Sequence, residues 1–394
     1  MSATIDHVPG SVRQPARFEG FVRDAFTGAG IEVGGARPWD VVVRDRRLYA
    51  RVALEGSLGL GEAYMDGWWD CADLGEFFRR LIPWRNARSG DWRLRAPSLL
   101  LDAMFAIRNL QSRARARHVI DAHYDLPAGL YERMLGPHMS YSCAYWRQAR
   151  TLDEAQHAKL DLICRKLELA PGMRLLDLGC GFGSVSRHAA EHYGCEVVAV
   201  TLSEEQARYA RTHCAGLPVT FHVCDYRDVD AYAGGRPFDR IANIAMFEAI
   251  GRRNARGFMA IVRRLLAPDG LWLLHTIGAD TDGADPWLHR YIFPNGELLT
   301  LERIHAAMRG HFFVEDLHNF GPDYAPTLAA WRDNFLGAWE AIRELAPTRF
   351  DERFRRMWVY YLECCRGAFA ARNNHLWQLV MAGPARAATY QAVR

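Results

Sequence analysis

Lysine is scarce in this 394-residue chain: only Lys159 and Lys166 occur among 49 basic residues, a bias we attribute to codon usage. No apolar run approaches the ~20 residues needed to span a bilayer, and the first residues lack the apolar core of a secretory signal. The nine cysteines show neither metal-ligand spacing nor a regular disulfide framework. We therefore expect reduced thiols, no metal site and a cytosolic protein.

A large excess of charge of one sign is also lacking, since the formal net charge is only +3. With no recognition motif present, nucleic acid is excluded as a partner. The composition, 49% hydrophobic and 24% charged, is that of a globular protein, and the length exceeds one ordinary core. We expect an N-terminal domain with its linker at 1–115 and a catalytic domain at 116–394 that carries a helical insertion at 326–372.

Seven short apolar or β-rich runs begin at Arg174, and helix-like or loop segments separate the first five: RLLDLG, EVVAVTL, VTFHV, FDRIANIA, LWLLHTI, FFVEDL and LWQLVMA. This alternation predicts an α/β domain with a mainly parallel sheet. Two amphipathic stretches, at 326–345 and 351–372, precede the last run and predict a lid or a substrate pocket.

The first 115 residues have a different pattern. They predict a helix at 18–27, a β region at 39–54, a glycine-punctuated stretch at 55–69 and a helix that ends near Leu81. A linker at 83–97 and an amphipathic segment at 98–120 with a basic end follow. We expect a smaller α+β domain here.

The stretch LLDLGCGFGS sets Asp177, Gly179, Gly181 and Gly183 between the first run and the next helix. Missing side chains there let a ligand lie against backbone N–H groups at a helix N-terminus. The spacing G-x-G-x-G is not that of a dinucleotide site, and no G-K-[ST] follows to hold phosphates. A purine ligand without a phosphate chain fits better, and S-adenosylmethionine is the common one. The alternative is a tight turn that serves packing.

The ends of the second and third runs offer further polar groups. Thr201, Leu202 and Gln206 follow the second run, where Gln206 is placed to bind a ribose hydroxyl; equally, Gln206 completes a helix-capping box with Ser203. After the third run, Asp225 and Tyr226 are placed to hydrogen-bond and stack on an adenine, or else form a satisfied turn with a half-buried ring.

Three longer stretches carry a resemblance: HYDLPAGLYERMLGPHMSYSCAYW, MFEAIG and LLHTIGADTDGADPWLHRYIFPNG. Together with the glycine loop they resemble the cyclopropane-fatty-acyl-phospholipid synthase family, related to the mycolic acid cyclopropane synthases, essentially from end to end. The resemblance implies a class I S-adenosylmethionine-dependent methyltransferase fold, Rossmann-like with a seven-stranded sheet, and an N-terminal lipid-binding domain. It implies methyl transfer to a cis double bond of a phospholipid acyl chain, then proton loss and ring closure.

The family's site residues carry over onto matching positions. The resemblance implies a bicarbonate ion as general base, held by Cys143, Glu248, His275, the backbone of Ile277, and Tyr324, whose ring also suits a developing cation. It places the cofactor against Tyr141, Ser142, Gly179, Gly181, Leu202, Gln206, Tyr226 and Ile244. Cys365 aligns with a cysteine sometimes assigned as catalytic, with helix packing as the alternative. From the residues alone, Cys143 reads as a small buried hydrophobe and His275 as a core histidine.

Two positions depart from the commonest family pattern. Phe182 stands where tryptophan is frequent, and Ala249 stands where many members have histidine, so a hydrogen bond from that histidine to Glu248 is absent here.

The inferred lipid substrate implies docking at the inner face of a membrane. The exposed-looking aromatic residues Trp68, Trp69, Phe77, Phe78 and Trp84 and the arginine-bearing segment 79–117 are candidates for that contact. The alternative is an ordinary core with a solvated arginine face. The family suggests a homodimer. Two other functions stay open: a methyltransferase that stops at a methyl-branched or methylene product, and a lipid-binding protein without turnover.

Overall fold

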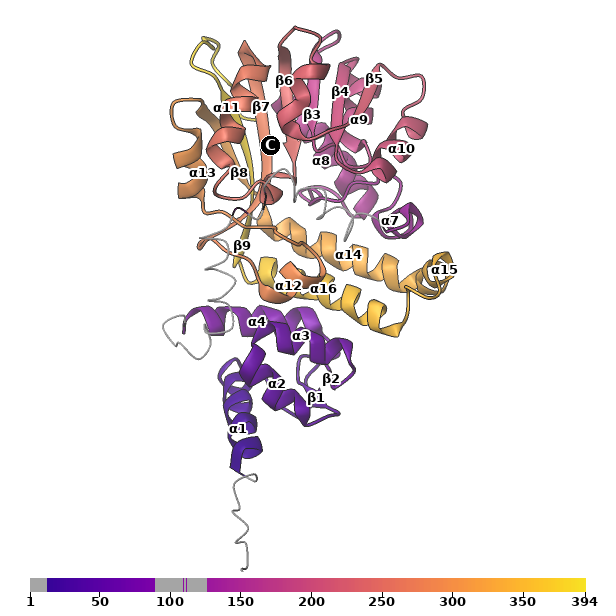
Figure 1. The fold of residues 1–394 in the computed structure, drawn as a ribbon, viewed down its shortest axis with the longest axis vertical. Helices are drawn as coiled ribbons and strands as arrows, with labels where there is room; N and C mark the ends of the chain where they lie inside the picture. Colours follow the sequence, from indigo (N-terminus) through magenta and orange to yellow (C-terminus); the bar gives the residue numbers. More distant parts are fainter. Residues whose placement is uncertain (1–12, 89–108, 110, 112–125) are drawn as a thin grey trace, which may run out of the picture.

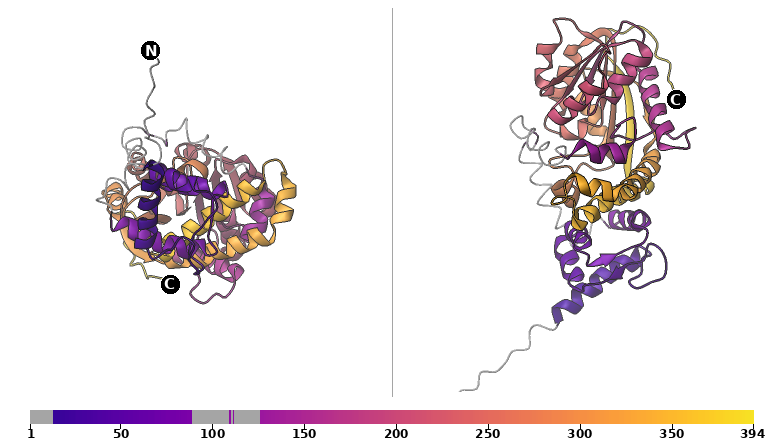
Figure 2. Two further views of the ribbon diagram at one scale, coloured as in Figure 1. Left: turned by 90° about the horizontal axis from the view of Figure 1, so that it is seen from below. Right: turned by 90° about the vertical axis from the view of Figure 1, so that its right-hand side faces the viewer.

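A computed structural model describes residues 13–88, 109, 111 and 126–394. The molecule has three tiers along its long axis (Figure 1). A sheet with its flanking helices forms the first tier, and the N-terminal helices form the last. Between them lie α14 (Tyr324–Gly337) and α16 (Glu352–Ala370), and the side view in Figure 2 shows the same order. The predicted amphipathic segment 98–120 lies, except for residues 109 and 111, outside the described residues.

The sheet in the described part has seven strands in the order β5-β4-β3-β6-β7-β9-β8. Their bounds are β3 Arg174–Leu178, β4 Glu196–Thr201, β5 Val219–Val223, β6 Phe238–Ile244, β7 Leu266–Ala279, β8 Phe313–Asn319 and β9 Asn374–Ala382. Neighbours from β5 to β7 pair in parallel, whereas β9 is antiparallel to both β7 and β8. All seven predicted strands and the mainly parallel α/β sheet are confirmed.

Helices cover the sheet on both faces (Figure 1). They are α8 Leu152–Lys166, α9 Ser184–Tyr193, α10 Glu204–His213, α11 Ala255–Leu265 and α13 Leu301–Met308, with α7 Ala128–Leu135, α12 Pro286–Tyr291 and the 3-10 turns η1 Tyr226–Tyr232, η2 Phe247–Ala249 and η3 Gly321–Asp323 in the connections. A full capping box of Thr151 and Glu154 begins α8, which fixes the helix that faces the glycine loop.

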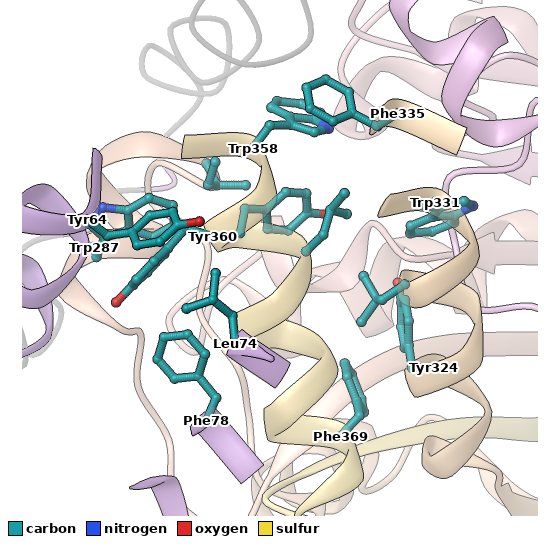
Figure 3. Close-up of a cluster of buried hydrophobic side chains, with 14 of the residues drawn as sticks. Tyr64, Leu74, Phe78, Trp287, Tyr324, Trp331, Phe335, Trp358, Tyr360 and Phe369 are labelled. Atoms are coloured by element: carbon teal, nitrogen blue, oxygen red, sulfur yellow. The ribbon is translucent and has the colours of Figure 1, made fainter. Parts of the chain in front are cut away.

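The two amphipathic stretches between β8 and β9 form α14, α15 (Trp339–Leu345) and α16. Figure 3 shows how α16 presents side chains to both sides. Tyr360 packs against Tyr64 and Phe78 from the N-terminal tier, with ring centroids 5.6 and 5.1 Å away, while Phe369 stacks on Tyr324 of α14 at 4.4 Å. The helix therefore joins the N-terminal tier to the sheet tier.

The N-terminal tier is mainly helical, with α1 Arg13–Gly28, α2 Arg47–Glu55, α3 Ser57–Met65 and α4 Leu74–Asn86. The predicted β region at 39–54 is wrong except for Val42–Val43, which pairs as β1 with β2 (Trp69–Asp70). The valine run favours a strand, but the following residues form α2, which buries Leu48 and Tyr49 on one face. Within the described ranges, no helix is both long and apolar enough to cross a bilayer.

Three of the five aromatic residues considered for membrane contact are buried instead. Trp69 and Phe77 are fully buried and Phe78 is 6% exposed. Trp68 and Trp84 are half-buried, and the guanidinium of Arg47 lies 4.6 Å from the Trp68 ring. The expectation of exposure is wrong for these three. Trp69 and Phe77 pack against each other and against Tyr64 and Phe26 of the same tier, and Phe78 packs against Tyr360 of α16.

A buried ion-pair network holds α4 on α16. Glu363, 2% exposed, accepts hydrogen bonds from the Gly75 N–H (2.8 Å), Arg332 Nη1 (2.9 Å) and Arg366 Nη2 (2.7 Å). The helices approach closely here, because a Cβ added at Gly367 would lie 2.4 Å from the Cβ of Phe78. Glycine is therefore required at the crossing.

We expect Glu363→Gln to lower the free energy of unfolding by about 2 kcal/mol, because it removes the buried anion that binds the half-buried guanidinium groups of Arg332 and Arg366. Urea unfolding followed by circular dichroism measures the change. Asp333→Asn is the matched control: Asp333 also pairs with Arg332 but is 63% exposed in its side chain, so the change should cost less than about 0.5 kcal/mol. Equal effects of the two variants would contradict a central role for Glu363.

Histidines lie side by side where α8 meets α9. The ring of His188 lies 4.5 Å from that of His192 and 5.1 Å from that of His157, between centroids. His188 is 5% exposed, and burial, then the charges of its histidine neighbours, lowers its pKa to about 4. The folded chain therefore holds this ring neutral at pH values where the unfolded chain protonates it.

This histidine should make the protein sensitive to acid. Its stabilising contribution is present above the unfolded pKa of about 6.5 and is lost as the pH falls toward 4, a loss of about 2 kcal/mol at pH 5. Between pH 7.5 and pH 5, the free energy of unfolding measured in urea should fall less for His188→Gln than for the wild type. The difference between the two proteins should equal the loss given above. His305→Gln, at an exposed position, should follow the wild type. Parallel losses in the wild type and His188→Gln would contradict the assignment.

Candidate active site

A cavity of about 200 Å³ opens beyond the carboxyl ends of β3, β4, β5 and β6. Its walls include Tyr141, Ser142, Asp177, Gly179, Gly181, Thr201, Leu202, Gln206, Asp225, Tyr226 and Ile244. These are all the residues predicted to bind the cofactor except Gly183, which caps α9. Open α/β sheets bind ligands at this edge, where successive strands depart to opposite faces.

The glycine loop fits a ligand held against backbone. Gly179, Gly181 and Gly183 have φ values of 79°, 54° and 84°, which side chains rarely adopt. A Cβ at Gly179 would lie 2.8 Å from Met246, whereas a Cβ at Gly181 would have no protein atom within 4 Å and would enter open space. The loop therefore leaves a cradle beside the N-terminus of α9.

At the second strand only half of the predicted capping box forms, because the Ser203 N–H donates to Thr201 Oγ1 and not to the Gln206 side chain. The Ser203 hydroxyl accepts the Gln206 N–H at 3.2 Å and caps α10, while Thr201 Oγ1 donates to Gln206 Oε1 at 2.8 Å in the cavity wall. At the third strand, Asp225 accepts the Arg227 N–H at 2.9 Å as a turn acid, and the Arg227 guanidinium lies 4.3 Å from the Tyr226 ring. Both groups still face the cavity.

Asp177 gives one end of the cavity an acidic group. It is 1% exposed, accepts a hydrogen bond from Ser186 Oγ at 2.6 Å, and burial raises its pKa to about 6. A cationic ligand group would stabilise its charged form.

The predicted catalytic residues lie behind the cavity wall. Glu248 sits in η2, just after β6, and its Oε1 accepts the Ile277 N–H at 2.6 Å. This N–H, predicted as an anion ligand, is therefore already bonded to a carboxyl group. Burial raises the pKa of Glu248, and its Oε2 has no hydrogen-bond partner within the described structure.

His275 lies inside β7, four residues before the strand ends, because antiparallel pairing with β9 extends β7 as far as Ala279. The directly opposite residue, Gln378, places its amide nitrogen 3.2 Å from His275 Nδ1. That amide donates, so Nδ1 accepts and Nε2 carries the ring proton. Burial lowers the pKa of His275 well below its usual value, and its Nε2 has no partner among the described groups.

The remaining candidate catalytic residues lie near Tyr324. It begins α14, is 7% exposed, and burial, then the charges of Cys143, Tyr361, Glu248 and Cys365, raises its pKa well above the usual value. These groups are close enough to interact electrostatically, so the structure brings together residues from four separate parts of the chain. Cys365 lies on α16, beside Tyr324.

The unpartnered atoms fit a small anion. Neutral His275 presents Nε2–H, and Glu248, whose pKa is raised by burial, presents an unpartnered carboxyl oxygen. His275 and Ile277 also share one face of β7, since side chains alternate along a strand. Buried groups without partners are rare and point to a bound molecule.

Several residues at the site have no counterpart in the sequence predictions. Tyr361 bonds the Tyr141 hydroxyl at 2.8 Å, and Gln378 orients His275; no short-range pattern signals either residue. Lys159 holds the segment that carries Ser142. The sequence did contain a feature that points to Lys159, because both lysines of the chain lie shortly before the glycine loop.

The chain is similar to proteins of known function. The family model described as mycolic acid cyclopropane synthetase matches residues 111–379. The cyclopropane-fatty-acyl-phospholipid synthase of Escherichia coli (strain K12) is 47% identical over 354 residues, which cover 89% of this chain and 90% of that protein. The structure of the cyclopropane synthase MmaA2 from Mycobacterium tuberculosis is 29% identical, with a TM-score of 0.62, covering 70% of this chain and all of that one. The mycolic acid cyclopropane synthase CmaA1, solved with SAH and CTAB, is 30% identical with a TM-score of 0.61, covering 67% and 97%.

Proposed function

The chain belongs to the mycolic acid cyclopropane synthetase family, and from that premise we propose that it is a cyclopropane fatty acid synthase. It would transfer the methyl group of S-adenosylmethionine to a cis double bond of a phospholipid acyl chain and then close the cyclopropane ring. The observation that carries the proposal is the junction of a cofactor-sized cavity with a buried cluster whose polar atoms lack partners.

Different residues of the chain bind the cofactor and favour methyl transfer. Gly181 keeps a side chain out of the cofactor's space, Gly179 avoids a clash with Met246, and Asp177 stands at the amino-acid end. An isolated alkene is a poor nucleophile, so alignment of the methyl group with the π face and exclusion of water supply most of the rate. The aromatic face of Tyr324 suits the cation that develops on the acyl chain.

For proton loss, we propose that Glu248 and His275, with Cys143 and Tyr324, hold a bicarbonate ion. When bound, that ion supplies the base that accepts the methyl proton. The two orphan polar atoms support this assignment, and Gln378 keeps the His275 Nε2 proton available for donation. Cys365 has no nucleophilic task in such a reaction, because the alkene itself attacks; its place beside Tyr324 suits packing.

We further propose that the protein acts at a membrane surface, as a peripheral protein and a homodimer. The lipid substrate is the main support for membrane docking, since burial of Trp69 and Phe77 removes two candidate anchors. On the N-terminal tier, Val42 and Leu54 remain apolar and exposed, at 49% and 65%, and Trp68 is partly exposed.

Proton NMR of recovered lipids tests the function. The full-length protein would be incubated with S-adenosylmethionine, bicarbonate and vesicles of a cis-monounsaturated phospholipid. We expect upfield ring-methylene signals and loss of olefinic protons. A gain of CH2 without ring signals would mean a methyltransferase that stops before ring closure. Cofactor binding without any gain would overturn the proposed reaction and favour a lipid-binding role.

A further inference from the structure

Lys159 is a buried cation without an anionic partner. It lies on α8 with no exposed surface, and in the described part of the chain no carboxylate lies within ion-pair distance of its Nζ. The chain's other lysine, Lys166, is equally buried but pairs with Asp316 at 3.4 Å. A buried charge without a partner is costly, and an anion bound nearby would relieve that cost.

The hydrogen bonds of Lys159 lead to the cofactor cavity. Its Nζ donates to Ser142 Oγ at 2.8 Å and also to Ser140 Oγ. Both serines are buried and both line the cavity. Since each hydroxyl oxygen accepts from an ammonium group, its own proton is polarised and free to donate elsewhere. Two strengthened donors therefore stand in the cavity wall.

An acidic group stands at the same end of the cavity. Asp177 lines the wall and is close enough to Lys159 for their charges to interact. One end of the cavity thus holds an acid and a lysine-backed donor pair, which together match an α-ammonium and an α-carboxylate. Tyr226 and Ile244 also line the cavity and are suited to a purine.

We infer that Lys159, acting through the hydroxyls of Ser140 and Ser142, is the positioning residue that recognises the α-carboxylate of the cofactor's methionine end. This inference rests on the proposed use of S-adenosylmethionine. Correct placement of that end fixes the sulfonium methyl relative to the alkene, so an error there reduces the rate as well as the affinity.

The charge of Lys159 is also sensitive to pH. Burial, opposed by the charges of Cys143 and Asp177, lowers its pKa to about 7. His275 and His138 also face it electrostatically. A bound carboxylate favours the charged ammonium, so binding takes up a proton when the pH is above 7. Affinity for a ligand with a carboxylate should therefore fall as the pH rises.

The test compares two ligands on the full-length protein by calorimetry without lipid. S-adenosylmethionine carries the carboxylate; decarboxylated S-adenosylmethionine keeps the ammonium, the sulfonium and the adenosine. We expect the wild type to prefer the first by roughly tenfold to a hundredfold, and Lys159→Met to abolish this preference. Gln156→Met is the matched control: Gln156 donates to the carbonyls of Ser140 and Ser142 but carries no charge, so the preference should persist.

The outcomes separate cleanly. Equal loss of affinity for both ligands in Lys159→Met and Gln156→Met would show that Lys159 only supports the segment, and would overturn the inference alone. If neither ligand binds the wild type, the proposed function fails with it. If Lys159→Met does not fold, the wild type decides: its preference should fall about tenfold between pH 6 and pH 8, and a constant preference would overturn the inference.

Discussion

Replacement of Glu248 by glutamine should lower kcat by about a hundredfold while cofactor affinity stays within about twofold. Glu248 lies behind the cavity wall, and its one bonded oxygen accepts the Ile277 N–H, a bond that an amide oxygen can also make. The fold should therefore survive. The amide has no exchangeable acidic proton and is the weaker donor, so the anion at Oε2 would be held less well and in the wrong protonation state.

The measurement is single-turnover formation of the ring product beside calorimetric binding of S-adenosylmethionine. Glu62→Gln is the matched control, because Glu62 is also a buried glutamate, but it lies on α3 of the N-terminal tier, where it accepts a hydrogen bond from the Tyr291 hydroxyl at 2.7 Å. It should change stability and leave kcat per folded molecule near the wild type. Normal turnover in Glu248→Gln would overturn the role of this residue in proton loss.

The sheet could be predicted from the sequence because its cause is local. Each strand is a short run of apolar or β-branched residues bounded by a turn, and buried parallel strands need little more. The glycine loop was predictable for the same reason, since Gly179 and Gly181 have backbone conformations that only glycine adopts readily. Features that depend mainly on neighbouring residues can therefore be predicted from the sequence.

The N-terminal tier was mispredicted where tertiary contacts decide. The valine run before Arg47 favours extended structure, yet the next residues fold as α2 to bury Leu48 and Tyr49. Trp69 and Phe77 resemble surface anchors, yet both are buried among aromatic rings of their own tier, and Tyr360 of α16 covers Phe78. The local sequence pattern does not show such tertiary packing.

The catalytic cluster could not be derived from spacing. Glu248 and His275 follow or lie in adjacent strands, but Cys143 comes from a loop and Tyr324 from a helix beyond β8. Their approach depends on the crossover order of the sheet and on the packing of α14. The resemblance supplied these positions, and the structure supplies the directions of their pKa shifts and their unpartnered atoms.

The second large effect should come from Gly181→Val, which we expect to weaken cofactor binding more than a hundredfold. A Cβ at Gly181 meets no protein atom within 4 Å, so the valine side chain would occupy cavity space without a clash in the fold. The residue has φ of 54°, and the strain of a branched side chain there costs about 1–2 kcal/mol of stability. Calorimetry with S-adenosylmethionine measures binding directly.

The control must be a glycine with a similar positive φ that lies outside the cavity wall. Gly310, between α13 and β8, has φ of 82° and likewise no atom within 4 Å of an added Cβ, and it lies outside the cavity wall. Gly310→Val should therefore lose a similar amount of stability and bind S-adenosylmethionine as the wild type does. If both variants bind the cofactor normally, the ligand does not lie against this loop, and the cradle beside α9 serves packing alone.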